Sequence, residues 1–273
     1  MAISMTSVSF ERPPLVETVL GVQFDSISGL SNAHLGAFWK TLGPEWPYVS
    51  DAPPLEFEFE QFGESHIWSA LGVQFRVTQD PATRIQIRNA RKDRMLQIQN
   101  GRLHYNWLGH LGHSYPRFSV VQPEFDDLLS RLTNFLQAEK LEAPKFNQWE
   151  VTYVNQLGKG TVWSSPEEWA NVFLPLGCTR QSLPGIGKFE SFGGEWHFEI
   201  EPQRGRLHIK VQHGRTMPPE ENEALIIKLT ARGPINLEQP ALSVGLDLGH
   251  KSIVSSFISL TSENAQAYWR HNR

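Results

Sequence analysis

Asn100 and Gly101 constrain the fold more than any other part of the sequence, because they separate two stretches of alternating polar and apolar residues. A two-residue type I′ turn needs positive φ at both central positions, and Asn-Gly is a pair that readily adopts it. The strands over 94–99 and 102–107 should therefore pair outward from this turn. Five large apolar side chains then share one sheet face, which we expect to be buried: Leu96, Ile98, Leu103, Tyr105 and Trp107.

Alternation with a period of two residues recurs along the chain, and turn-forming residues separate the alternating segments. It predicts strands over 15–24, 55–62, 68–77, 84–90, 149–157, 196–201, 206–213, 223–229 and 241–248. Apolar residues at helical spacing predict helices over 32–42, 123–139, 253–260 and 263–269, and another helix beginning after Ser165. Long helices combined with antiparallel hairpins are typical of an α+β protein.

The predicted elements follow a similar order in the two halves of the chain. Each half begins with a strand, continues with a helix and several antiparallel strands, and ends with a helix. The sequence therefore predicts a duplicated β-α-β(4–5)-α unit with antiparallel curved sheets and helices packed on one face. The first α+β half covers 1–143 and the second covers 144–273. The sequence leaves open whether the halves share one continuous sheet.

Composition excludes several classes of protein. The 273 residues include 16 Phe and 9 Trp, whereas disordered segments are poor in aromatic residues. No apolar run is long enough to span a membrane, and the first residues lack the apolar core of a signal peptide. Because the chain has a single cysteine, Cys178, we expect neither an intramolecular disulfide nor a thiolate zinc site. We expect a cytoplasmic protein without a cofactor, and the net charge of −4 argues against a dedicated nucleic-acid binder.

Two terminal regions carry a family resemblance. Near the start stand Pro13-Pro14-Leu15-Val16-Glu17-Thr18-Val19 and Gln23-Phe24; near the end stand Asp247, His250, Ile253, Phe257, Leu260-Thr261 and Tyr268-Trp269. In these regions the chain resembles a sporadically distributed, uncharacterised bacterial family of about the same length. The resemblance implies a prokaryotic origin and a patchy distribution that suits defence or conflict modules. That family has no established activity and no agreed catalytic residues, so the resemblance assigns none here.

Arginines concentrate in the first half of the chain, at Arg76, Arg84, Arg88, Arg91 and Arg94. Such a basic sheet face could bind a nucleic-acid backbone or a nucleotide, because guanidinium groups match phosphate oxygens. Arg94 is the weakest candidate for this basic face, since the alternation of its strand places it on the side of the sheet that faces the core. The predicted strand over 55–62 offers the opposing charges Glu56, Glu58 and Glu60. The sequence favours cross-strand ion pairs on a solvated face, worth a few tenths of a kcal/mol each.

The predicted hairpin around 202–205 places histidines and glutamates on one sheet face. Pairing outward from its turn gives these partners: Glu201 with Arg206, Glu199 with His208, and His197 with Lys210. Histidine and carboxylate side chains can hold zinc or serve as acid and base, so His197, Glu199 and His208 are candidates for a metal-dependent hydrolase. Cross-strand pairing preference alone selects the same residues. The sequence favours that interpretation, with these three as binding residues and no metal.

Three shorter patterns carry little functional information. The stretch 185–188 (Gly-Ile-Gly-Lys) lacks the first glycine and the final Ser or Thr of a phosphate-binding loop. His110 and His113 have no carboxylate partners at metal-ligand spacing. We expect Asp247 and His250 to lie where a strand meets a helix, as a cap or a dipole partner. No catalytic residue is predicted.

These observations favour a non-enzymatic, protein-binding or scaffold component. Its expected partner is another protein, encoded nearby, and aromatic side chains close to turns are candidate anchors for it: Trp46, Tyr48, Trp163 and Trp169. Nucleic-acid or nucleotide binding through residues 76–94 is the first alternative. A metal-dependent hydrolase is the second.

Overall fold

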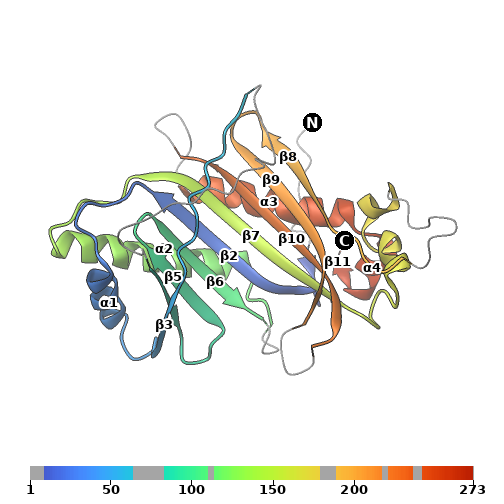
Figure 1. Cartoon of the computed structure of the whole chain (residues 1–273), viewed down its shortest axis with the longest axis horizontal. Helices are drawn as coiled ribbons and strands as arrows, with labels where there is room; N and C mark the ends of the chain where they lie inside the picture. Colours follow the sequence, from blue (N-terminus) through green and yellow to red (C-terminus); the bar gives the residue numbers. More distant parts are fainter. Residues whose placement is uncertain are drawn as a thin grey trace.

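A computed structural model describes residues 9–63, 83–109, 114–178, 189–216, 221–235 and 242–272. Its nine-stranded antiparallel sheet consists of β2 (Leu15–Phe24), β3 (Tyr48–Ala52), β4 (Arg84–Arg88), β5 (Arg94–Gln99), β6 (Arg102–Leu108), β7 (Phe146–Gly158), β8 (Gly194–Glu201), β9 (Gly205–Arg215) and β10 (Glu223–Pro234). The strand order is β3-β4-β5-β6-β2-β7-β10-β9-β8 (Figure 1). A separate two-stranded sheet pairs β1 (Ser9–Phe10) with β11 (His271–Asn272).

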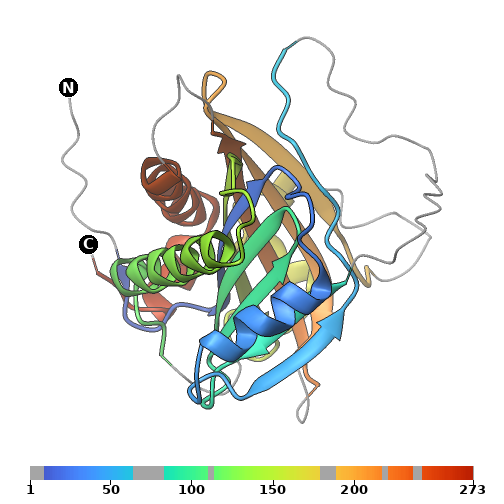
Figure 2. The same cartoon turned by 90° about the vertical axis from the view of Figure 1, so that its left-hand side faces the viewer.

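The helices lie on one face of the large sheet, as the end-on view shows (Figure 2). They are α1 (Asn32–Thr41), α2 (Phe118–Ala138), α3 (Leu242–Leu260) and the short α4 (Glu263–Tyr268), with two 3₁₀ helices, η1 (Pro166–Asn171) and η2 (Leu174–Cys178). The molecule is therefore α+β. No helix in the described ranges is both long and apolar enough to cross a membrane.

The hairpin at Asn100-Gly101 has the predicted register, with Ile98 opposite Leu103 and Leu96 opposite Tyr105. The predicted type I′ turn is wrong, because φ is positive at Gly101 (96°) but not at Asn100. The five apolar side chains predicted to share the inner face are each at most 2% exposed. The local turn chemistry therefore determined both the register and the buried face.

The two halves share one continuous sheet, because β2 and β7 are neighbours at its centre. From β2 outward the order is β6, β5, β4, and from β7 outward it is β10, β9, β8. The long helices α2 and α3 follow the strands of their own halves. The second half thus repeats the strand order of the first, with β3 as an additional edge strand.

The predicted strand over 241–248 is wrong, because α3 begins at Leu242. Gly245 and Gly249 lie one helical turn apart against the indole of Trp149 in β7. A Cβ atom on Gly245 would lie 2.3 Å from Cδ1 of that ring, and one on Gly249 would lie 2.7 Å from Cζ3.

Two other helices differ less from the prediction. The helix α2 begins before Pro123, at Phe118, and the helix after Ser165 is the 3₁₀ helix η1.

The predicted strand over 55–62 is also wrong. Residues 53–63, here called the strap, cross over the open face of the sheet from the first half to the second (Figure 1). Side-chain amides hold the strap. Gln99 bonds the N–H and C=O of Leu55 at 2.8 and 2.9 Å, and Gln148 bonds the C=O of Glu58 and the N–H of Glu60 at 2.5 and 2.9 Å.

Alternation in the strap is inverted relative to the prediction. Phe57 and Phe59 are 40% and 57% exposed, whereas the side chain of Glu60 is only 5% exposed. Glu60 therefore faces the sheet, where it contacts arginines of the second half, whereas Glu56 and Glu58 stay exposed. The predicted strand over 68–77, with Arg76, lies outside the described residues, as do His110, His113 and the stretch 185–188.

Candidate functional site: the polar face of the sheet

The face of the sheet opposite the helices is polar. Registers across five central strands place Gln97, His104, Gly21, Glu150 and Arg232 in one continuous row. Many polar side chains of this face are less than 9% exposed: Gln97, Gln99, Arg102, His104, Asn106, Gln148, Thr152, Arg206 and Thr230. Burial of so many polar groups is costly unless each has a partner. This face is therefore the part of the molecule that most needs a functional explanation.

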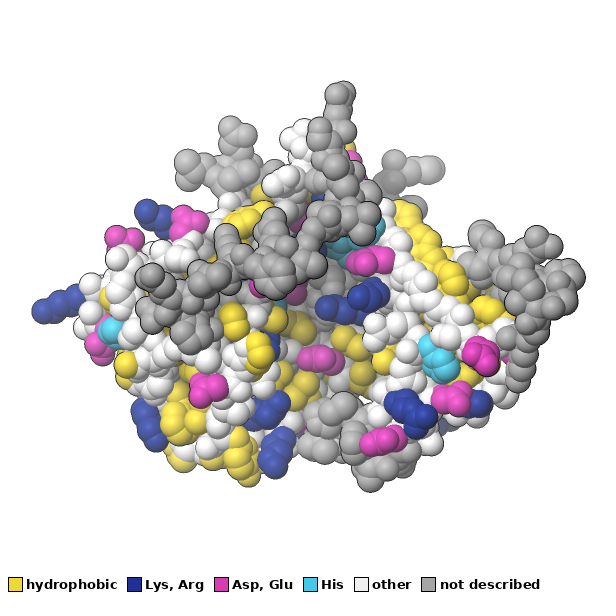
Figure 3. Space-filling model, in the orientation of Figure 1, with side chains coloured by type: hydrophobic (Ala, Val, Ile, Leu, Met, Phe, Trp, Pro, Cys, Tyr) yellow, Lys and Arg dark blue, Asp and Glu magenta, His cyan; other side chains and the backbone are white. Residues whose placement is uncertain are grey.

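A cavity of about 570 Å³ lies over the centre of this face, between the strap and the strands of both halves. Its described lining contains five basic side chains, Arg84, Arg102, Lys210, Lys228 and Arg232, and four glutamates, Glu17, Glu58, Glu150 and Glu195. Figure 3, which views this side of the molecule, shows side chains of both charges interspersed here with apolar ones. The cavity therefore offers charged groups at close range.

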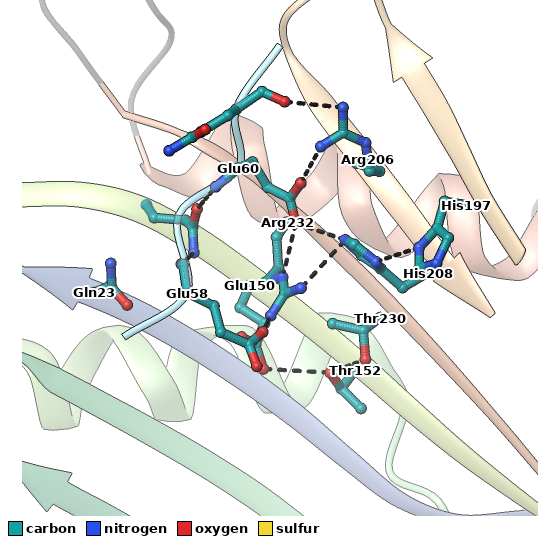
Figure 4. Close-up of polar contacts among 12 residues, drawn as sticks. Gln23, Glu58, Glu60, Glu150, Thr152, His197, Arg206, His208, Thr230 and Arg232 are labelled. Atoms are coloured by element: carbon teal, nitrogen blue, oxygen red, sulfur yellow. Dashed lines mark hydrogen bonds and ion pairs between the residues drawn. The ribbon is translucent and has the colours of Figure 1, made fainter. Parts of the chain in front are cut away.

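Glu60 neutralises a pair of arginines at one end of this face (Figure 4). Arg206 and Arg232 lie directly opposite each other on β9 and β10. One carboxylate oxygen of Glu60 is 2.6 Å from Nη1 of Arg206, and the other is 3.0 Å from Nε of Arg232. Glu58 adds a second ion pair to Arg232. Burial nevertheless lowers the pKa of Arg232 to about 10.

His104 lies at the centre of the cavity floor, over Gly21. A Cβ atom on Gly21 would be 2.7 Å from Cδ2 of the imidazole, so only glycine leaves room for the ring. Burial, and then the positive charges of Arg102, Arg84 and Lys228, lower the pKa of His104 to about 3. The imidazole is therefore neutral at neutral pH, although Glu150 lies 3.8 Å from its Nε2. Burial is the main cause of this low pKa, and the three nearby positive charges lower it further.

Four basic side chains of the cavity have no ion-pair partner in the ranges that the structure describes: Arg84, Arg102, Lys210 and Lys228. Lys210 and Lys228 face each other directly across β9 and β10. Arg102 donates to the amide oxygen of Gln23 at 2.8 Å, and its charge adds to burial in lowering the pKa of Arg84. Nε of Arg84 is buried without a hydrogen-bond partner among the described residues.

The four described arginines of the predicted basic face, Arg84, Arg88, Arg91 and Arg94, do not all lie on one face, and Arg76 lies outside the described residues. Arg84 lines the cavity, but Arg88 only approaches Gln86, with Nη2 3.4 Å from the amide oxygen. Arg91 is 71% exposed and pairs with Asp93. Arg94 lies on the helix side of the sheet, where its Nε is 2.8 Å from a carboxylate oxygen of Glu124 in α2. The predicted ion pairs with the strap are wrong as well, because Glu58 and Glu60 bind arginines of the second half.

The hairpin of β8 and β9 has a register different from the predicted one. A register shift between Glu199 and Glu201 places Glu199 opposite Arg206 and His197 opposite His208. The carboxylate of Glu199 accepts a hydrogen bond from the N–H of Gln203 in the turn. The predicted common face of His197, Glu199 and His208 is therefore correct, but the pairing within it is wrong.

A second cavity, of about 800 Å³, lies on the helix side between the N-terminal segment, α2 and α3. The hydroxyl groups of Tyr115 and Tyr153 are 2.9 Å apart, and that of Tyr153 is 2.8 Å from Nδ1 of His250. Burial lowers the pKa of His250 to about 4. Asp247 pairs with Lys251 within α3, so the predicted capping role of Asp247 and His250 is wrong.

Sequence reasoning missed several residues of the polar cavity, above all His104, Lys228 and Arg232. Gly21, between Leu20 and Val22 in β2, was a local signal in the sequence, because a strand glycine often marks close approach of another group. No protein-family model and no curated protein matches this chain. The resemblance to the bacterial family therefore stays a prediction.

Proposed function

We propose that the chain binds a phosphate-bearing small molecule in the cavity of the polar face. The observation that carries this proposal is the placement of Lys210 directly opposite Lys228, with Arg84 and Arg102 in the same cavity. Like charges opposite each other destabilise a sheet. An anion between them would remove that repulsion and give the buried donor of Arg84 a partner.

The size of the cavity favours a small molecule over a nucleic acid. Its volume of about 570 Å³ lies within the usual range for small-molecule sites, roughly 300–1,000 Å³. The described lining contains no Phe, Tyr or Trp ring on which a base could stack, and the net charge of the chain is −4. We therefore infer recognition of the phosphate group, with Glu17, Glu150 and Thr152 available to bind hydroxyl groups of the ligand.

Isothermal titration calorimetry with inorganic pyrophosphate, AMP and ribose 5-phosphate tests the proposal. At least one of them should bind with a Kd below about 1 mM. The double variant Lys210→Met/Lys228→Met should bind at least ~10-fold more weakly, since a charge-assisted contact contributes about 1.5–3 kcal/mol. Lys251→Met is the matched control, because Lys251 lies in α3 on the other side of the sheet.

Two results would overturn the proposal: no binding of any of the three anions, or equal binding by the wild type and the double variant. A single-stranded oligonucleotide that binds far more tightly than pyrophosphate, in competition with it, would instead support the nucleic-acid alternative. Both lysines are exposed, so the double variant is expected to fold.

Protein binding is a second candidate function, supported by the exposed face of the strap. Phe57 and Phe59 are 40% and 57% exposed, and aromatic side chains are common anchors at interfaces. Of the anchors predicted from the sequence, Trp163 and Trp169 are each 1% exposed and cannot serve. Co-purification with the product of an adjacent gene, lost in Phe57→Ser/Phe59→Ser, is the expected outcome. A complex unaffected by this double variant would contradict a role of the strap.

We also infer that the chain arose by duplication of one β-α-β-α unit, as its sequence suggests. Support comes from the strand order β2-β6-β5-β4 and its counterpart β7-β10-β9-β8, each followed by a long helix. In this interpretation β2 and β7 are equivalent strands. The ligand cavity then lies across the join between two related halves, which is a common place for a binding site.

A further inference from the structure

Glu195, His197 and His208 form a compact group at the β8–β9 end of the polar face. Each offers one ligand atom, and the three atoms lie within 4.8 Å of one another. We propose that these side chains bind a divalent transition-metal ion, with zinc as the best chemical match. Two imidazoles and one carboxylate are a ligand set that zinc accepts in proteins, and the harder ions calcium and magnesium prefer oxygen ligands alone.

The fold brings these ligands together through strand pairing. His197 and His208 are direct cross-strand partners, so their side chains project from the same face at the shortest distance that a sheet allows. Their rings meet edge to face, with centroids 4.9 Å apart and an interplanar angle of 81°. Glu195 precedes His197 by two residues on β8 and therefore points to the same side.

The orientation of His208 is fixed from behind by Glu60 (Figure 4). Nε2 of His208 is 2.6 Å from a carboxylate oxygen of Glu60, and a carboxylate only accepts, so Nε2 carries the proton. Arg232 Nη2, at 3.2 Å from the same nitrogen, is also a donor, and the shorter contact decides the tautomer. Nδ1 of His208, which faces His197, is then the nitrogen placed to bind the metal ion. Metal-binding histidines are typically held by a carboxylate in this way.

The two Nδ1 atoms are 2.8 Å apart, a distance that either a shared proton or a metal ion can explain. Zinc bonds imidazole nitrogens at about 2.0–2.1 Å, so tetrahedral geometry holds two of them roughly 3.3 Å apart. A small rotation of the partly exposed His197 ring provides that spacing. Glu195 is exposed, so its carboxylate can turn toward the ion without disturbing the core.

Two nearby arginines are already neutralised, which reduces their repulsion of a cation at this site. Glu60 and Glu58 neutralise Arg206 and Arg232, and Glu195 itself supplies a negative charge. Glu195 and His208 also line the polar cavity. A three-ligand site facing a cavity leaves a coordination position for water or a ligand, as catalytic zinc sites do.

Zinc titration of the metal-stripped full-length chain tests the site. Calorimetry should show one high-affinity equivalent of Zn²⁺, and Co²⁺ should give the intense visible absorption of a four-coordinate complex. His197→Ala should weaken zinc binding at least ~10-fold, and Glu195→Gln should weaken it measurably. His34→Ala is the matched control, because it removes a histidine of α1 and should leave the zinc affinity unchanged.

His197 is a partly exposed residue of an edge strand, so its variant is expected to fold, which a thermal melt in EDTA verifies. Zinc binding that is absent in the wild type, or that is equal in the wild type, His197→Ala and Glu195→Gln, would overturn the assignment. Pyrophosphate binding is measured separately in EDTA, so failure of the metal site and failure of the anion site are distinguishable.

Discussion

At the scale of single residues, the packing of the polar face depends on one glycine, Gly21. Gly21 lies in the central strand β2, where glycine is unfavourable because it packs nothing and loses much entropy on folding. Its place is occupied by the imidazole of His104, with Cβ of Glu150 on the other side. The alternation of β2 and β6 was readable from the sequence. The contact was not, because it depends on the pairing of strands that are far apart in the chain.

Gly21→Ala is therefore expected to destabilise the protein. The new methyl group would meet Cδ2 of His104 at 2.7 Å, and overpacking of this kind typically costs about 1–3 kcal/mol. Gly36→Ala in α1 is the matched control, because no atom lies within 4 Å of the added Cβ and removal of a helical glycine stabilises by roughly 0.5–1 kcal/mol. Urea unfolding measures both free energies, and a neutral Gly21→Ala would contradict this packing.

The low pKa of His104 predicts a loss of stability in acid. The folded pKa of about 3 lies below the unfolded value of 6.5, so the unfolded state binds the proton first. The stabilisation is complete above pH 6.5 and is lost as the pH falls toward 3. Between pH 7 and pH 4 the wild type should lose on the order of 3 kcal/mol more than His104→Gln. His34→Gln should lose as much as the wild type, and parallel losses in all three proteins would contradict the assignment.

At the scale of elements, sequence patterns predicted the structure formed by neighbouring residues. They predicted the wrong element where contacts with distant segments determine the structure. The Asn100-Gly101 turn predicted its hairpin correctly, because turn and strands are adjacent in the chain. The strap has a strand-like alternation, yet its bonding partners are the side chains of Gln99 and Gln148. In α3, the spacing of Gly245 and Gly249 was the available helical signal. The role of these two glycines depends on Trp149, nearly a hundred residues away, whose ring fills the space beside both of them.

Gln148→Leu is expected to release the strap from the sheet. The change leaves the N–H of Glu60 and the C=O of Glu58 without the amide that binds both, at a cost of about 1–3 kcal/mol. Hydrogen exchange at residues 55–61 should accelerate, while exchange in β5 and β6 should not change. Gln156→Leu in the same strand β7 is the control, because the side-chain amide of Gln156 contacts the end of β9, at Arg215 O. Unchanged exchange in the strap would show that Gln148 does not hold it.

At the scale of the whole molecule, several contacts join the halves, including the pairing of the terminal strands β1 and β11. In the large sheet, β2 pairs with β7 along the backbone. On its polar face, the strap carries Glu60 from the first half onto β9 and β10 of the second. Pattern reasoning predicted two similar halves. It could not predict a charged contact between residues 146 positions apart, since many arginines in the sequence were equally available. The cavity therefore exists only in the assembled molecule.

Glu60→Gln tests how strongly this charged contact couples the halves. Arg206 and Arg232 would keep their charges at a buried position but lose most of the compensating carboxylate. Removing one partner of a buried ion pair typically costs 3–5 kcal/mol, and the remaining pair between Arg232 and the partly exposed Glu58 should moderate this to roughly 2–4 kcal/mol. Glu56→Gln is the matched control on the same strap, since Glu56 is exposed, and it should change the free energy of unfolding by less than about 0.5 kcal/mol.

The two variants also differ in what they predict for cooperativity. If Glu60 links the halves, β5 and β9 should have equal hydrogen-exchange stabilities in the wild type. Glu60→Gln should separate these stabilities, whereas Glu56→Gln should leave them equal. A Glu60→Gln protein with wild-type stability would mean that solvent already screens the arginine pair. In that case the strap would act through its amide contacts alone, and the polar cavity would be open to water at this end.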